Sequence, residues 1–344
     1  MQNVEIEMFK TIRPRKIRLD ASTLCQLRCP CCSTAARKIE PAIGFGCLKF
    51  KDFKKLLDEN RYLKEIELSN YGEIFLNPEL DSIIKYAYEK KVRLLAENGV
   101  NFNTVADQML EMLVAYRFRL LLISIDGASH QTYQQYRVNG NFAMVIKNIR
   151  KLNNYKSLHD SDYPRLIWQF VIFGHNEHEI PLAKKMAQDF GMRFILKLSW
   201  DRHFSPIKNL DFVKKESGLP VSDCEADQVM QGAEYGASFC RMLWEEPQIN
   251  WDGKILGCCC NHWRQFDGNA FTDGLVPALN SESITYARAM LQGLKPLRED
   301  IPCATCDLYL ERAKANQWLK RGVNMTAFRV KSRLRKLIHY ALDQ

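Results

Sequence analysis

Near its amino end the chain reads Lys16-Ile-Arg-Leu-Asp-Ala-Ser-Thr-Leu-Cys25-Gln-Leu-Arg-Cys29-Pro-Cys-Cys32. The first four residues favour a short β-strand, and the cysteines follow at once on a loop. The spacing C-x-x-x-C-x-x-C places Cys25, Cys29 and Cys32 on one short segment. Three thiolates can bind three corners of a four-iron cluster, which usually takes four protein ligands. One iron is then left open to a substrate or a cofactor.

A zinc site is the alternative use of these thiols. Structural zinc is almost always bound by four Cys, His or carboxylate ligands in a tetrahedron. The nearby sequence supplies no spaced Cys or His pair that would close such a site, so iron–sulfur binding is favoured. Cys31 lies between Pro30 and Cys32 and is expected to neighbour the ligands rather than to be one of them.

The composition is that of an ordinary folded protein, with 344 residues, 46% hydrophobic and 26% charged. The net charge is +9, but residues 311–344 hold nine Lys and Arg against two acids, which leaves about +2 for the rest. A body so nearly neutral lacks the basic footprint of a nucleic-acid binder. The sequence therefore predicts no nucleic-acid partner.

The chain has twelve cysteines but no sign of export. Residues 1–18 are charged and lack the apolar core of a secretory signal, and the run Leu120–Ile123 is far too short to span a membrane. We therefore expect a cytoplasmic protein, where thiols stay reduced and more often bind metals than form disulfides.

Short apolar runs alternate with amphipathic stretches over the first 200 residues. The expected strands are Lys16–Leu19, Leu63–Leu68, Val92–Ala96, Leu120–Ile125, Leu166–Phe173 and Phe194–Leu198. The expected helices are Phe50–Leu57, Pro78–Lys90, Thr104–Tyr116, Phe142–Asn153 and Asn176–Phe190. Helical crossovers between strands imply a parallel sheet. Six such units predict an α/β fold, a partial (β/α)6 TIM-like barrel with its chemistry at the carboxyl ends of the strands.

With its cysteine loop directly after the first strand, the chain resembles the radical S-adenosylmethionine enzymes over roughly residues 16–315. The resemblance implies that Cys25, Cys29 and Cys32 bind a 4Fe-4S cluster whose open iron chelates S-adenosylmethionine. It implies reductive cleavage of that cofactor to a 5'-deoxyadenosyl radical, which abstracts hydrogen from the substrate. A reduced flavodoxin or ferredoxin would donate the electron. Cys31 departs from the family, in which many members carry a bulky residue beside the last ligand.

Further motifs fall where the expected strands end. Ser69-Asn-Tyr-Gly-Glu73 resembles the family's Gly-Gly-Glu turn, with Tyr71 in place of the first glycine. Gly72 would let the backbone approach the cofactor, and Glu73 would accept hydrogen bonds from its ammonium group. Asn98 belongs to a Glu-Asn-Gly sequence that resembles the family's Thr-Asn-Gly and is expected to orient the cofactor. Ordinary turns are the alternative for both motifs.

The fourth strand is expected to end with polar residues. A period of two puts Ser124 and Asp126 on the same face, and the resemblance assigns them to the cofactor's ribose or other polar groups. Helix capping is the alternative for Asp126. Arg137 is predicted to clamp a carboxylate or phosphate of substrate or cofactor, with a surface ion pair as the alternative. Gln169 is a further candidate. No residue stands out as general acid or base.

A second group of cysteines begins after the alternation stops near residue 201. Two separated halves supply four thiolates for a closed site, which suits zinc or iron–sulfur. The four are Cys240, Cys258, Cys303 and Cys306. With the first motif, they resemble the shortened SPASM extension called a twitch domain, which implies one auxiliary 4Fe-4S cluster. No cysteine follows Cys306, so a second auxiliary cluster is not expected.

The other cysteines are expected to be bystanders. Cys259 and Cys260 adjoin Cys258, but the spacing from Gly253 favours Cys258 as the ligand. Cys31 and Cys47 complete this group together with Cys224, for which a ligand or catalytic role stays open. His262 is expected to be structural or a surface residue.

The expected domains are 1–200, the partial barrel; 201–320, the twitch-like extension; and 321–344, a basic amphipathic helix. The apolar and basic side chains of Phe328–Leu342 alternate at helical spacing. The helix would pack on its own domain, or alternatively make peripheral contact with an anionic membrane.

We expect an enzyme that oxidises a small polar substrate such as a sugar or cyclitol, because twitch-bearing relatives include a dehydrogenase of that kind. Peptide-modifying maturases are the first alternative, although these often carry a leader-recognition domain ahead of the cluster loop, which here begins at Cys25. A zinc-stabilised binding protein without redox chemistry is the alternative from another class.

Overall fold

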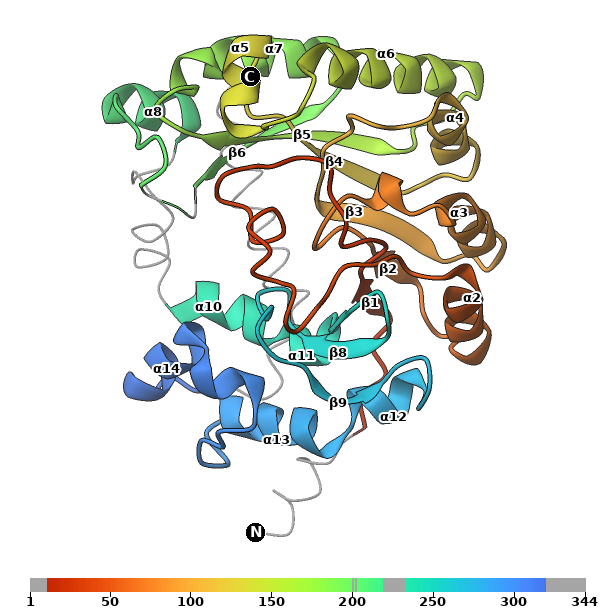
Figure 1. Ribbon diagram of the computed structural model, residues 1–344, viewed down its shortest axis with the longest axis vertical. Coiled ribbons are helices and arrows are strands. Elements are labelled where there is room, and N and C mark those ends of the chain that lie inside the picture. Colours follow the sequence, from red (N-terminus) through yellow and green to blue (C-terminus); the bar gives the residue numbers. More distant parts are fainter. Residues whose placement is uncertain (1–10, 200, 202, 219–232, 320–344) are drawn as a thin grey trace.

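A computed structural model describes residues 11–199, 201, 203–218 and 233–319. One nine-stranded sheet runs through it in the order β6-β5-β4-β3-β2-β1-β7-β8-β9 (Figure 1). Strands β1 to β6 are parallel neighbours in chain order. They are β1 (Lys16–Leu19), β2 (Glu65–Glu67), β3 (Arg93–Val100), β4 (Leu120–Ser124), β5 (Arg165–Ile172) and β6 (Arg193–Leu198). The predicted α/β fold with six parallel strands is confirmed.

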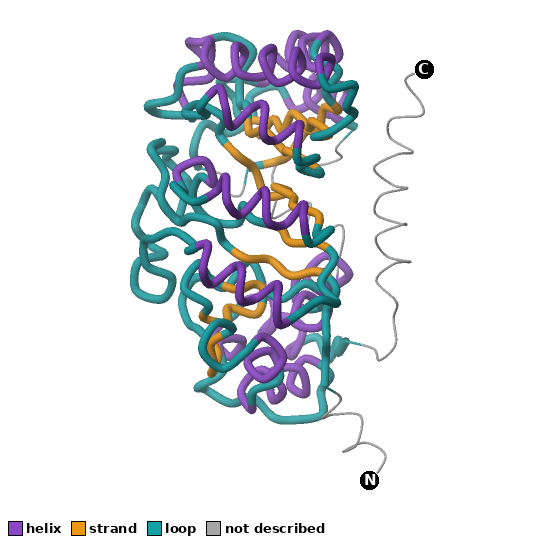
Figure 2. Tube along the Cα trace, turned by 90° about the vertical axis from the view of Figure 1, so that its right-hand side faces the viewer, coloured by secondary structure: helices purple, strands orange, loops and turns teal. Residues whose placement is uncertain are grey.

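Helices lie between successive strands and cover one face of the sheet, as the stacked purple coils of Figure 2 show. They are α2 (Phe50–Glu59), α3 (Leu80–Glu89), α4 (Asp107–Ala115), α5 (His130–Tyr136), α6 (Phe142–Leu158) and α7 (Ile180–Asp189). In β1, Ile17 and Leu19 are fully buried in the same core as Phe53 of α2. Because side chains alternate along a strand, Lys16 and Arg18 point to the opposite face, which is the inside of the half-barrel.

The chain after β6 continues the same sheet. Strand β7 (Gln248–Ile249) pairs in parallel with β1, and β8 (Lys254–Gly257) and β9 (Phe266–Asn269) then add antiparallel. The expected turn before Cys258 is present: Gly253, with φ of +87°, lets the chain reverse between β7 and β8. Helices lie around these strands: α10 (Ala233–Cys240), α11 (Met242–Glu245), α12 (Leu275–Leu279), α13 (Glu282–Leu291) and α14 (Asp307–Lys314). Helix α8 (Leu210–Ser217) instead lies beside α7, at the β6 end of the sheet (Figure 1). Two 3-10 turns also matter below, η1 (Ile74–Leu76) and η3 (Pro302–Thr305).

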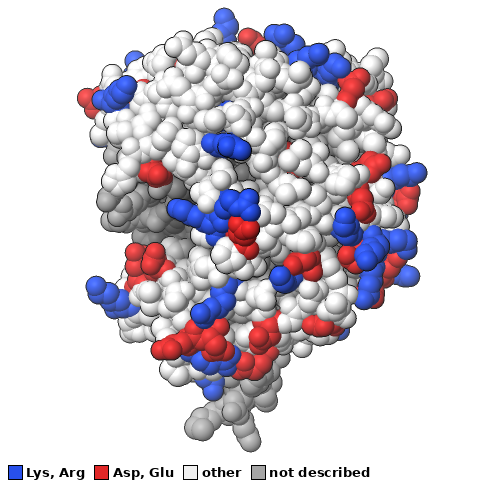
Figure 3. Space-filling view, viewed as in Figure 1, with Lys and Arg blue, Asp and Glu red and all other residues white. Residues whose placement is uncertain are grey.

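Two sequence expectations fall on segments that the structure does not describe. Cys224 and the basic segment 321–344 both lie outside the described residues. Within the described ranges, no helix is both long and apolar enough to cross a membrane. On the face drawn in Figure 3, acidic and basic side chains mix along the edge formed by α2, α3 and α4.

Candidate active site

The cysteine loop lies across the carboxyl ends of the parallel strands. It leaves β1 at Asp20 and is tied to the neighbouring loops by backbone hydrogen bonds. The amide of Glu73 donates to the carbonyl of Leu24 at 2.7 Å, and the amide of Arg28 donates to that of Val138 at 3.0 Å. The loop therefore spans the edge from the end of β2 to the segment after α5, which is where an α/β half-barrel positions its chemistry.

The three predicted ligands are free thiols that lie within electrostatic reach of one another. Burial, followed by Glu73 and the thiols of Cys29 and Cys32, raises the pKa of the Cys25 thiol to about 12. Two hydrogen-bond donors face the sulfurs: Asn101 Nδ2 lies 3.7 Å from Cys25 Sγ, and Arg137 Nη1 lies 3.8 Å from Cys29 Sγ. Such donors stabilise sulfur that carries negative charge. The donor set fits a cubane cluster held by three cysteines.

Within the described ranges, no three His, Cys, Asp or Glu side chains converge closely enough to hold a single metal ion. The ligands of an iron–sulfur cube each bind a different iron, so they need not converge in that way. Cys31 instead faces Asp201, and burial followed by that carboxylate raises the pKa of its thiol to about 12.

Gly72 and Glu73 hold the cysteine loop against β2. Gly72 has φ of +74°, and a Cβ built on it would lie 2.6 Å from the carbonyl oxygen of Ser22, so only glycine fits beneath the loop. Glu73 is 1% exposed and caps the turn η1. Its Oε1 accepts from the amide of Phe75 at 3.3 Å and its Oε2 from the amide of Asn101 at 2.5 Å. Burial raises the pKa of Glu73 to about 7.

Asn98 and Ser124 lie at the ends of the next two strands. The Asn98 amide donates to Ser69 Oγ at 3.2 Å, and its side chain donates to Asn70. Ser124 is buried, and its hydroxyl accepts a 3.2 Å hydrogen bond from Gln169 Nε2 on the paired strand β5. These residues form a polar layer across β2 to β5, at the same edge as the cysteine loop.

Asp126 and Arg137 form a buried ion pair that reaches the cysteines. Arg137 Nε donates to Asp126 Oδ2 at 2.6 Å, with side-chain exposures of 14% and 0%. Asp126 Oδ1 accepts from the amide of Val171 at 2.7 Å. Burial alone would lower the pKa of Arg137, but Asp126 and Cys29 hold it well above its usual value. The surface ion pair considered for Arg137 is wrong, because the pair is buried and touches Cys29.

The second group of thiols comes together below β1. Cys240 is the last residue of α10, and Cys258 follows β8. Cys303 lies in η3, and Cys306 follows it. Burial, followed by the neighbouring thiols, raises the pKa of Cys240 and Cys303. The same causes act on Cys258, whose neighbours include both Cys240 and Cys306. The four side chains are thus neighbouring free thiols, a donor set that fits an iron–sulfur cluster, whose ligands each bind a different iron.

No known protein family matches the chain by its family profile. Over 184 residues the chain is 28% identical to the AdoMet-dependent heme synthase of Methanosarcina barkeri (strain Fusaro / DSM 804), an alignment that covers 53% of this chain. It covers 49% of that protein, so the chain spans about half the length of the curated relative it matches.

Solved structures align over much more of the chain. Streptococcus suis SuiB bound to S-adenosylmethionine has a TM-score of 0.63 and 14% identity, covering 93% of this chain and 79% of SuiB. SuiB bound to the precursor peptide SuiA has a TM-score of 0.61 and 14% identity, covering 89% and 72%. The chain has the fold of the radical S-adenosylmethionine enzymes. The fold that this resemblance implies is therefore confirmed.

The structure gives roles to residues that the sequence did not single out. Tyr71, noted only as a departure from the family's turn, donates its hydroxyl to the carbonyl of Cys259 at 2.9 Å. Asp20 accepts from the amide of Tyr71 at 3.1 Å and from Gln248 Nε2 of β7 at 3.0 Å. The bonds from Tyr71 to Cys259 and from Gln248 to Asp20 join the half-barrel to the extension. They link residues 188 and 228 positions apart, so no local sequence pattern predicts them.

A buried row of charges lines the inside of the half-barrel. Lys16 Nζ lies 2.5 Å from Glu97 Oε2 and 3.0 Å from Glu246 Oε2. Arg18 lies 3.6 Å from Glu67 Oε2, beyond hydrogen-bond distance. Its Nε and Nη1 atoms are buried without a hydrogen-bond partner among the described residues. Burial would lower the pKa of Arg18, but the surrounding acids hold it above its usual value.

Proposed function

We propose that the chain reductively cleaves S-adenosylmethionine and uses the 5'-deoxyadenosyl radical to abstract hydrogen from a small polar substrate. The supporting observation is the thiol loop itself. Cys25, Cys29 and Cys32 are held at the carboxyl edge by two different anchors, the Gly72–Glu73 turn and Arg137. When bound there, a 4Fe-4S cluster supplies the electron and a vacant iron vertex.

The chain's own residues would bind and orient the cofactor. Ser124 and Asn98 present polar groups at the strand ends beside the loop, where they are placed to hydrogen-bond a ribose or an amino acid moiety. Arg137 places a cation beside Cys29, which favours the anionic form of that sulfur. Glu73 uses its carboxylate on backbone amides, so its contribution is to shape the loop.

The interior charges favour a substrate with hydroxyl or amino groups. Buried polar groups are nearly always hydrogen-bonded, yet Arg18 Nε and Nη1, Glu67 Oε2 and Gln169 Oε1 have no hydrogen-bond partner among the described residues, and those of Arg18 and Glu67 are held only by ion pairs of 3.6 and 3.8 Å. These atoms belong to β1, β2 and β5, on the inner face of the sheet. A sugar or cyclitol supplies the donors and acceptors that would satisfy them.

Cofactor cleavage tests the first part of this proposal. Anaerobically reconstituted protein with dithionite and S-adenosylmethionine is expected to release 5'-deoxyadenosine. Cys29→Ala should abolish that release, whereas Cys47→Ala, a change at a thiol outside the ligand set, should retain it. Release that survives Cys29→Ala would overturn the cluster assignment. A colourless protein that contains zinc after anaerobic purification would favour a zinc-stabilised binding protein.

Hydrogen transfer tests the second part. A deuterated sugar or cyclitol that is the substrate should pass deuterium into 5'-deoxyadenosine. Arg18→Gln should lose this substrate-dependent transfer while still cleaving S-adenosylmethionine, because Arg18 lies inside the half-barrel rather than on the cysteine loop. Equal deuterium transfer by Arg18→Gln would contradict the interior as the substrate site.

We further propose that Cys240, Cys258, Cys303 and Cys306 hold an auxiliary 4Fe-4S cluster that accepts an electron, so that the net reaction is an oxidation. The support is that the four are free thiols near enough to raise one another's pKa. Reconstituted protein should contain about eight iron per chain, two four-iron clusters. Cys303→Ala with Cys306→Ala should lose about half of the iron. Full iron content in that double variant would refute this assignment.

A peptide substrate is the second candidate, which the fold likeness to SuiB raises because that protein is seen bound to a precursor peptide. Deuterium transfer from a labelled peptide, with none from sugars or cyclitols, would favour it. In either case we expect a reduced flavodoxin or ferredoxin to donate the electron.

A further inference from the structure

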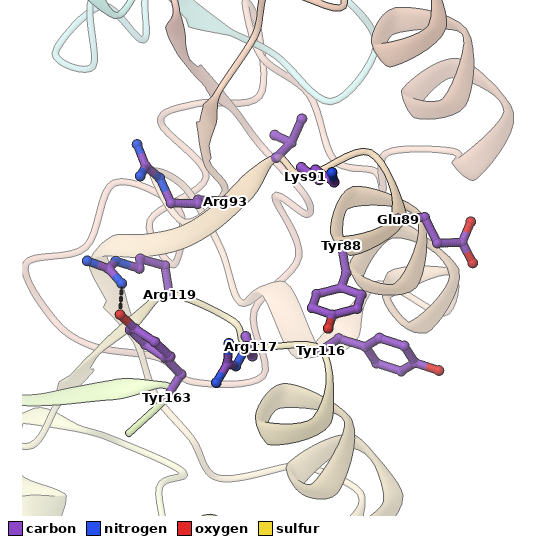
Figure 4. A pocket seen from close by; sticks show the side chains of 9 residues that line it. Tyr88, Glu89, Lys91, Arg93, Tyr116, Arg117, Arg119 and Tyr163 are labelled. Carbon is purple, nitrogen blue, oxygen red and sulfur yellow. Dashed lines mark hydrogen bonds between the residues drawn. The ribbon is translucent and has the colours of Figure 1, made fainter. Parts of the chain in front are cut away.

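A cavity lies at the opposite edge of the sheet from the cysteine loop. Its volume is about 510 Å³, within the range of small-molecule sites (Figure 4). Its walls come from the end of α3, the segment after α4 and the starts of β3, β4 and β5. Because these strands are parallel, their amino ends share one edge, and the carboxyl ends that hold the candidate active site form the other.

Four basic side chains line this cavity against one acid, Glu89. Arg93 is paired with Glu65 at 2.9 Å. Lys91, Arg117 and Arg119 have no acidic partner within ion-pair distance among the described residues. Figure 4 shows the carboxylate of Glu89 pointing away from the arginines. The cavity therefore has a positive charge that its own walls do not neutralise.

Helix capping does not account for these cations. Basic residues are favoured near helix carboxyl ends because they interact with the last carbonyls. Here backbone amides fill those carbonyls: Lys91 N donates to Tyr88 O at 3.0 Å, and Arg117 N donates to Val114 O at 3.0 Å. No hydrogen bond from the Lys91 or Arg117 side chain to a carbonyl is present in the described ranges.

Lys91 and Arg117 have a backbone conformation that favours glycine. Lys91 and Arg117 have φ of +58° and +51°. Other helices also end in this conformation, among them α7 with Gly191 at φ of +63°, α13 with Gly293 at +70° and α6 with Asp160 at +45°. A left-handed conformation costs about 1–2 kcal/mol for a residue with a side chain. The two junctions that flank the cavity therefore carry basic side chains at some cost in stability.

Tyrosines form the remaining walls. Tyr163 accepts a hydrogen bond from Arg119, whose guanidinium lies 4.6 Å from the Tyr163 ring centroid. On the other side, Tyr88 and Tyr116 meet edge to face with centroids 5.6 Å apart (Figure 4). An arginine fixed on an aromatic ring keeps its outward N–H groups in place for a bidentate contact.

We propose that this cavity binds a phosphate-bearing ligand, with the phosphate held by Lys91, Arg117 and Arg119 and the organic part held between the tyrosines. Arginine forks match phosphate oxygens, and the charge of a phosphate would offset that of the lining. Two sources supply this chemistry: a soluble ligand of nucleotide size and the head group of an anionic phospholipid. This site is independent of the function proposed above.

Binding titrations test the site with defined probes. ADP and inorganic pyrophosphate represent the soluble source, and phosphatidylglycerol vesicles, compared with phosphatidylcholine vesicles, represent the head group. Saturating S-adenosylmethionine keeps adenosine compounds out of the cofactor site. Arg117→Gln with Arg119→Gln should weaken binding about tenfold or more. Lys91→Gln with Arg117→Gln is the second variant, since both side chains are exposed and their loss should not affect folding.

The matched control removes the same charge elsewhere. Lys147→Gln with Lys185→Gln, on the exposed surfaces of α6 and α7, should bind like the unmodified protein. Binding of ADP or of anionic vesicles that is lost in both cavity variants and kept in the control supports the site, and the probe that binds identifies the source. No binding by any probe, or equal binding by the cavity and control variants, overturns it.

Discussion

At the scale of single residues, Gly72 shows how one backbone position sets the candidate site. The carbonyls of the cysteine loop lie against it, and its φ of +74° excludes an easy replacement. Gly72→Ala should cost about 3 kcal/mol of unfolding free energy, from the left-handed backbone and from overpacking. Gly191→Ala is the control, since φ is +63° but no atom lies within 4 Å of the added Cβ; it should cost about 1 kcal/mol.

Chemical denaturation of both variants measures this difference, and iron content after reconstitution reports the loop. Gly72→Ala should also bind less iron at the first cluster. If the two variants were equally stable, the close approach of the loop would not constrain Gly72.

Glu73 makes a second prediction at this scale, about pH. Burial raises its folded pKa from 4.5 to about 7. The folded protein therefore holds this proton more tightly than the unfolded chain, so the stabilisation is complete below about pH 4.5 and is lost as the pH rises through about 7. A shift of that size corresponds to about 3 kcal/mol.

Denaturation of the unmodified protein and of Glu73→Gln across pH 5 to 8 tests this shift. The unmodified protein should lose stability relative to the variant as the pH rises, because the glutamine cannot ionise. Parallel curves would show that the carboxyl group titrates near its ordinary pKa in the folded protein.

At the scale of elements, the ion pair of Asp126 and Arg137 joins the end of β4 to the end of α5 and so to the cysteine loop. Removing one partner of a buried pair leaves the other charge unpaired and costs about 3–5 kcal/mol. Arg137→Gln and Asp126→Asn should each show that loss, and the double variant should lose less than the sum. Unfolding free energies of the four proteins measure the coupling.

The surface pair of Arg37 and Glu40 is the control for this cycle. Both residues are exposed, and their pair is screened by water, so Arg37→Gln should leave stability nearly unchanged. Additive effects of Arg137→Gln and Asp126→Asn would show that the buried pair does not act as a unit.

The elements that periodicity could not find are short, irregular or dependent on distant partners. All six expected strands and five expected helices are present, because each has an apolar face against one core. Helix α5 is not predicted, because its seven residues, HQTYQQY, have no clear apolar periodicity. Strand β3 runs past Ala96 through a polar Glu-Asn-Gly stretch to Val100, where its pairing with β4 shifts register.

The candidate site likewise contains residues that the sequence predicts and contacts that it does not. Cysteine spacing predicts the loop, and period two places Ser124 and Asp126 on one face. The partners of Arg137 and Tyr71 depend on contacts between segments far apart in sequence, so only the folded chain reveals them. The basic cavity at the amino edge is likewise assembled from several loops.

At the scale of the whole molecule, one sheet connects the half-barrel and the extension. Gln248 donates to Asp20 and Tyr71 donates to the carbonyl of Cys259 across the junction, and β7 pairs with β1. We expect both parts to unfold in one cooperative transition. Hydrogen exchange followed by mass spectrometry at increasing denaturant should show β4 and β8 losing protection together. Earlier loss in β8 would indicate that the extension unfolds on its own.

The position of β1 between β2 and β7 also bears on solubility. Without β7, one side of β1 would display amides and carbonyls in an extended row, with the apolar Ile17 and Leu19 alongside, and such a row can recruit strands from other molecules. By pairing β7 with β1, the extension covers a strand that would otherwise be an unpaired edge of the sheet. Expressing only the half-barrel should accordingly yield aggregates, and light scattering would reveal them.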